Sequence, residues 1–123
     1  MNLTLETNDQ APRISRQKLA ERQSEFEPRY DDLALVVSEL VSNSVRHSGY
    51  GTVSVSVKRT MDRVRLEVKD PGPCFDPDHT DSPDHINGDG MGLQIVNRVA
   101  DAWGIDSEGD CTVWVEMALP VRT

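Results

Sequence analysis

The stretch Glu39-Leu-Val-Ser-Asn43-Ser-Val-Arg-His47 carries three polar side chains at intervals of four residues. At that spacing, each lies about 40° around a helix from the one before. The surrounding sequence predicts a helix from about Asp31 to His47. Its core-facing side would carry Leu33, Val36, Val37, Leu40, Val41 and Ser44. The three polar residues then line the edge of this apolar stripe, where we expect a cleft beside the core.

Two interpretations of this polar ribbon are open from the residues alone. Glu39 could polarise a water or hydroxyl nucleophile, and Asn43 could offer its amide oxygen to Mg²⁺. The alternative is an ordinary solvated flank, because helix flanks are usually polar. His47 could contact a phosphate or satisfy the last carbonyls of its helix. Arg46 is interpreted as a solvated side chain.

The second stretch, Asp70-Pro-Gly72-Pro73, ends the second strand of a predicted antiparallel hairpin, Thr52–Arg59 and Val64–Asp70. Asp70 is in phase with the inward-facing valines and leucine of its strand, so its carboxylate should face the interior. A buried carboxylate needs hydrogen-bond donors, and the amino group of adenine would supply one. Gly72 would let the backbone approach a flat base. The alternative is a common strand-ending turn.

The third stretch, Gly88-Asp-Gly90-Met91-Gly92-Leu93, opens a predicted helix from Leu93 to Trp103. Free backbone N–H groups at a helix N-terminus favour phosphate oxygens, and glycines permit close approach. No Gly-Lys-Ser/Thr follows, so this is not a Walker A loop. No βαβ unit surrounds it, so it is not a Rossmann turn.

The remaining patterns complete an α+β order in a single domain, residues 1–123. We expect a two-layer sandwich: one mixed, mostly antiparallel sheet covered on one face by about three helices. Further predicted elements are an edge strand at Asn2–Thr7, an amphipathic helix at Ala11–Phe26, a long loop at Pro71–Asp89 and a last strand at Thr112–Leu119.

In this order, the three stretches resemble the Bergerat ATP-binding fold of histidine kinases, type II topoisomerases and heat-shock chaperones. The resemblance extends from Ala11 to Pro120. The compact size looks most like the anti-sigma-factor serine/threonine kinases and their small ATP-binding relatives.

The resemblance implies ATP and Mg²⁺ as cofactors. Asn43 would be the metal ligand and Glu39 the general base, while Asp70 would hold the adenine amino group above Gly72. Residues Cys74–Asp89 would form a lid over the nucleotide. The remaining nucleotide contacts would be Gly90, Met91, Gly92 and Leu93 toward the phosphates and Thr112 in the polar network beside the adenine. His47, at the end of the same polar ribbon, is a candidate phosphate contact from its position alone.

Composition and cysteine spacing argue against several classes of partner and site. A net charge of −8 argues against sequence-independent binding to nucleic acid, which requires clustered Lys and Arg. Cys74 and Cys111 lie outside CxxC or His-rich settings, so their spacing indicates neither a zinc site nor a disulfide framework. Neither a signal sequence nor a long apolar run is evident, so we expect no membrane contact and a cytoplasmic location.

Three functions follow as hypotheses. The first is a protein kinase that phosphorylates a serine of an anti-anti-sigma antagonist, acting as a homodimer by resemblance. The second is a stoichiometric inhibitor that captures a sigma factor or other regulator, with ATP as a structural ligand. The third is a relative that has lost nucleotide binding. It is motivated by Pro73, which replaces the second glycine of the usual DxGxG motif, and by the acidic lid.

Overall fold

The structure is a computed structural model. It describes residues 1–48, 51–71, 89–107 and 109–120, with the backbone alone described at 47, 48 and 89–93. The helices of this part are α1 (Ala11–Ala20), α2 (Gln23–Phe26), α3 (Tyr30–Ser48) and α4 (Asp89–Val99). The strands are β1 (Asn2–Glu6), β2 (Thr52–Arg59), β3 (Arg63–Asp70), β4 (Ala102–Asp106) and β5 (Cys111–Ala118).

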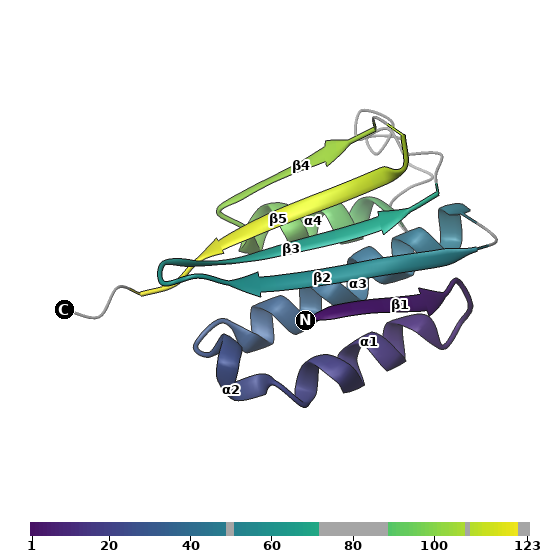
Figure 1. Ribbon diagram of the computed structural model, residues 1–123. Helices are drawn as coiled ribbons and strands as arrows, with labels where there is room; N and C mark the ends of the chain where they lie inside the picture. The colour runs from purple at the N-terminus through teal and green to yellow at the C-terminus, as the bar shows by residue number, and fades with distance from the viewer. Residues whose placement is uncertain (49–50, 72–88, 108, 121–123) are drawn as a thin grey trace.

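The five strands form one sheet in the order β1-β2-β3-β5-β4, and all four pairings are antiparallel. Figure 1 shows the helices gathered on one face of this sheet. The predicted α+β sandwich is therefore confirmed, with no parallel pair among the described strands.

Alternating side chains make one face of the sheet apolar. Buried residues on β2, β3 and β5 alternate with half-buried residues that are polar except for Trp114, as expected for strands covered on one side only. The core unites these inward side chains with the apolar face of α3, whose predicted core-facing leucines and valines are all buried. Burial of this stripe is what holds α3 against the sheet.

Two helix predictions were wrong in their boundaries. The segment Ala11–Phe26 forms two helices, because Arg22 adopts non-helical backbone angles between them. Both Leu19 and Phe26 are fully buried, so packing against the core redirects the chain before α3.

The helix predicted at Leu93–Trp103 begins at Asp89 and ends at Val99. Trp103 belongs instead to β4, where it pairs with Val115 and packs against the core. Apolar residues at helical spacing continue past Val99, so the sequence pattern placed the end of the helix too late. The chain leaves the helix at Val99 because residues from Ala102 onward form hydrogen bonds with β5 as strand β4.

Among the described residues, no helix combines the length and the apolar character needed to cross a membrane.

Candidate functional site

Helix α4 runs antiparallel to α3, and one arginine fixes this arrangement. Arg29, just before α3, donates hydrogen bonds from Nη2 to the carbonyl of Val99 (2.9 Å) and from Nη1 to that of Ala118 (2.9 Å). The end of α4 is thereby held beside the start of α3. The start of α4, which carries Gly90 and Gly92, therefore lies toward the C-terminal half of α3, as Figure 1 shows.

The end of β3 lies at the same end of the molecule. Strand β2 begins at Thr52, shortly after α3 ends at Ser48, and its Ser54 pairs with Lys69 of β3. Strand β3 thus ends near the C-terminal end of α3, as Figure 1 shows. Asp70 is the last residue of this strand. Three stretches that are far apart in the sequence converge at one end of the sheet.

Asn43 is the most deeply buried polar side chain of α3, with 1% of its surface exposed. Its Oδ1 accepts a hydrogen bond from Nη2 of Arg46, one turn later on the same helix. Its Nδ2 is buried without a hydrogen-bond partner. A buried amide N–H without an acceptor is costly, which makes Asn43 a candidate for contact with an acceptor on a bound molecule.

Glu39 precedes Asn43 by one turn and is half-buried. Among the described residues its carboxylate meets no donor in a hydrogen bond or ion pair. A carboxylate in this position is available to accept a proton from a group bound beside Asn43.

Asp70 is buried, with 8% of its surface exposed, as its phase in the strand predicted. The residue opposite it on β5 is Cys111, which is also buried and is disulfide-bonded. The sequence spacing did not predict a disulfide, and the other cysteine, Cys74, lies outside the described residues. The neighbour of Asp70 therefore carries no ionisable thiol.

Thr112 occupies the other face of the sheet. It is half-buried and in phase with Trp114 and Glu116, whereas Asp70 is in phase with the buried residues of β3. The register thus brings Cys111, not Thr112, to the side of Asp70. The role predicted for Thr112 stays a prediction, and this placement does not support it.

The other predicted site residues are placed only in part. Gly90, Met91, Gly92 and Leu93 form the first turns of α4, and their side chains lie outside the described residues. His47 lies in the last turn of α3, again with the backbone alone described. Gly72 and nearly all of the predicted lid fall outside the described residues.

The described residues fit a nucleotide with a bound metal ion. The buried Asp70 carboxylate can accept a hydrogen bond from an adenine amino group, and the Asn43 amide offers one oxygen ligand. No cluster of three or more metal-binding side chains occurs in the described part of the chain. A Mg²⁺ ion would accordingly be held through Asn43 together with phosphate oxygens, as is usual for this ion.

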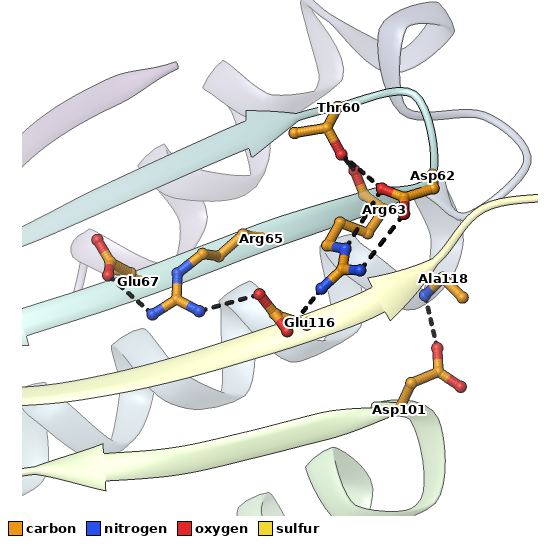
Figure 2. A network of polar contacts seen from close by, with 8 residues as sticks. All are labelled: Thr60, Asp62, Arg63, Arg65, Glu67, Asp101, Glu116 and Ala118. Carbon is orange, nitrogen blue, oxygen red and sulfur yellow. Dashed lines mark hydrogen bonds and ion pairs between the residues drawn. The ribbon is translucent and has the colours of Figure 1, made fainter.

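Two other surface features lie away from this site. A hollow of about 1180 Å³ is lined by residues of the β2–β3 turn, including Met61, together with Pro28 and Pro120. The outer face of the sheet carries the network in Figure 2, where Arg65 donates hydrogen bonds to Glu67 and Glu116. These charges pair with one another.

The comparisons with known proteins agree with this geometry. The family of histidine kinase-, DNA gyrase B- and HSP90-like ATPases matches residues 28–122. The chain belongs to this family. Membership in this ATPase family implies ATP binding, in keeping with the buried amide and carboxylate at the end of the sheet. The match spans both Asn43 and Asp70.

A solved structure is similar in fold to nearly the whole chain. The crystal structure of the RsbU and RsbW domains of Rv1364c from Mycobacterium tuberculosis matches with a TM-score of 0.66 and 22% identity over 99% of this chain. The match covers 33% of the Mycobacterium tuberculosis chain, so the present protein spans about a third of the length of that solved structure. No curated protein is significantly similar to the chain.

Proposed function

We propose that the protein binds ATP with Mg²⁺ and acts as a serine/threonine protein kinase on an antagonist protein. The observation that carries the proposal is that the buried Asn43 and the half-buried Glu39 lie one turn apart on α3, beside the end of β3. An amide oxygen for the metal and a carboxylate for the acceptor hydroxyl are the minimum that phosphoryl transfer requires.

Each residue has a distinct task in this proposal. Asp70 accepts a hydrogen bond from the adenine amino group and so orients the base. Asn43 contributes its amide oxygen to the metal site, and the first turn of α4 offers backbone N–H groups to the phosphates. Glu39 takes the proton from the attacking serine hydroxyl. Bound Mg²⁺ would supply the charge that offsets the phosphate oxygens.

The protein partners follow from the resemblance to the anti-sigma-factor kinases. We propose an anti-anti-sigma protein as the phosphorylated antagonist, a sigma factor as the protein that is captured, a cytoplasmic homodimer as the active form, and no direct contact with nucleic acid. The acidic net charge of −8 is in keeping with a protein partner rather than a nucleic acid.

Transfer of labelled phosphate tests the kinase activity. The purified chain, ATP and Mg²⁺ are incubated with an anti-anti-sigma protein and with the same protein carrying alanine at its acceptor serine. We expect label on the first and none on the second. Glu39→Gln should reduce transfer about 100-fold or more, which is the usual contribution of a general base.

The same variant separates the kinase from a stoichiometric inhibitor. Undiminished transfer by Glu39→Gln would contradict the role of Glu39. If nucleotide binds but no transfer occurs, while sigma-factor capture persists in Glu39→Gln, the inhibitor function replaces the kinase. Arg98→Met, at an exposed position in the last turn of α4, is the control for general damage.

A further inference from the structure

The acceptor atom proposed as the metal ligand already has a cationic partner. Arg46 is exposed on α3, and its guanidinium donates from Nη2 to Oδ1 of Asn43, which is itself almost fully buried. This contact also fixes the direction of the amide, because only the oxygen can accept from a guanidinium. The amide nitrogen is left on the buried side, without a partner.

A metal ion and a guanidinium would conflict on this oxygen. The Asn43 oxygen has two lone pairs, so two partners are possible in principle. A divalent ion at ligand distance would, however, lie within a few ångströms of the positive guanidinium, and the two repel strongly in a partly buried site. Ligation of a metal by Asn43 therefore requires Arg46 to move away.

We propose that Arg46 holds the Asn43 oxygen in the nucleotide-free protein and must leave it before Asn43 can ligate Mg²⁺. The proposal rests on the function proposed above and adds a device to it: a resident cation competes with the metal for one ligand atom. Arg46 thereby sets how strongly nucleotide binding depends on Mg²⁺.

The competition has opposite consequences with and without metal. When a nucleotide binds without Mg²⁺, Arg46 remains as a cation beside the polyphosphate and partly offsets its charge. When Mg²⁺ is present, part of the metal's binding free energy is spent on displacing Arg46. Both effects lower the gain in nucleotide affinity that Mg²⁺ brings to the wild-type protein.

The test is a titration calorimetry cycle on the full chain. The affinity for ADP and for a non-hydrolysable ATP analogue is measured with saturating Mg²⁺ and with EDTA, for wild type, Arg46→Met and Arg98→Met. We expect Mg²⁺ to increase affinity by a factor at least about tenfold larger in Arg46→Met than in wild type, the change expected for loss of a charged hydrogen bond. Arg98→Met should match wild type.

The change in affinity with EDTA, compared with the change in Mg²⁺, distinguishes competition for the Asn43 oxygen from simple phosphate binding by Arg46. Competition predicts that Arg46→Met binds nucleotide more weakly in EDTA but no more weakly in Mg²⁺. Equal weakening in both conditions, or an unchanged Mg²⁺ factor, would overturn the proposal while leaving ATP binding intact. If the wild type binds neither nucleotide, both this proposal and the proposed function fail.

A second readout does not depend on nucleotide affinity. In the NMR spectrum of the free protein, the Nε–H signal of Arg46 should be resolved, and it should move when Asn43→Ala removes the acceptor. Addition of ADP with Mg²⁺ to the wild type should shift it as well. A signal indifferent to both changes would show that the contact with Asn43 is absent in solution, and would overturn the proposal.

Discussion

At the scale of single residues, the candidate site combines two buried polar side chains, Asn43 and Asp70, with the half-buried Glu39. The positions of Asn43 and Asp70 beside the core followed from the sequence, because helix and strand periodicity places each beside an apolar stripe, while their roles stay predictions. Arg46 and Cys111 were missed. The direction of a long side chain and the register between two strands depend on tertiary packing, and no local pattern carries either of them.

Replacement of Asp70 tests the adenine contact. Asp70→Asn keeps the shape of the side chain but replaces one acceptor oxygen by a donor group that faces the adenine amino group. We expect nucleotide affinity to fall at least about tenfold, since a charge-assisted hydrogen bond is lost. Calorimetric titration measures the loss, and Asp62→Asn at the exposed β2–β3 turn is the matched control. Equal affinity in the two variants would contradict the assignment.

Gly104 on β4 lies so close to the indole ring of Trp114 that a larger side chain would collide with it. A Cβ at this position would lie 2.8 Å from the indole of Trp114, and Arg65 sits 4.9 Å from the centroid of that ring. Gly104→Ala should force the indole to move and lower the free energy of unfolding by about 1–3 kcal/mol.

Urea denaturation measures this cost, and the Trp114→Ala background is its control. Without the indole the substitution should be close to neutral. A cost of the same size in both backgrounds would show that the close contact is not its cause.

At the scale of elements, the site depends on the antiparallel placement of α3 and α4. The sequence predicted α3 to within a residue at each end, since its apolar stripe is long and regular. It could not predict the link between the two helices, because Arg29 reaches carbonyls that are 70 and 89 residues away in the chain.

Removal of the Arg29 side chain should loosen this placement. Arg29→Met leaves the carbonyls of Val99 and Ala118 without their donor, so we expect a loss of about 1–3 kcal/mol in the free energy of unfolding. Arg22→Met is the control. It breaks only the exposed pair with Glu25 at 3.7 Å and should cost less than about 1 kcal/mol. Chemical denaturation compares the two, and equal losses would contradict the structural role of Arg29.

The ion pair between Asp62 and Arg63 in the β2–β3 turn should make the stability of the protein depend on pH. The hydrogen bond from Arg63 lowers the pKa of Asp62 below its ordinary value, with help from the hydroxyl of Thr60 (Figure 2). A carboxyl whose pKa is depressed on folding stabilises the protein above its unfolded pKa, and this contribution is lost as the pH falls through the folded pKa.

Asp62→Asn removes this contribution. Wild type should therefore melt slightly above Asp62→Asn at about pH 6, and the difference should vanish near about pH 2. Thermal melts at both pH values measure it, and high salt should shrink the difference at the higher pH. A difference that grew on acidification would contradict the sign of the shift.

At the scale of the whole molecule, sequence patterns were enough for the fold class and for the elements that carry Asn43 and Asp70. Alternating valines placed β2 and β3, and the order of motifs matched the family later identified over residues 28–122. The end of α4 was not predictable, because it is settled by the pairing of β4 with β5. The outer face of Thr112 follows from the alternation along its strand, in which Val113, Val115 and Met117 point inward.

The central claim is that α3, β3 and the start of α4 form one nucleotide site at one end of the sheet. Chemical-shift mapping with ATP and Mg²⁺ on the full chain tests it most directly. We predict that the backbone amides of Asn43, Asp70 and Gly92 shift together with a single affinity, while those of the turn at residues 60–63 stay unchanged. Saturating nucleotide that leaves all three amides unmoved, or that shifts the turn instead, would contradict the claim.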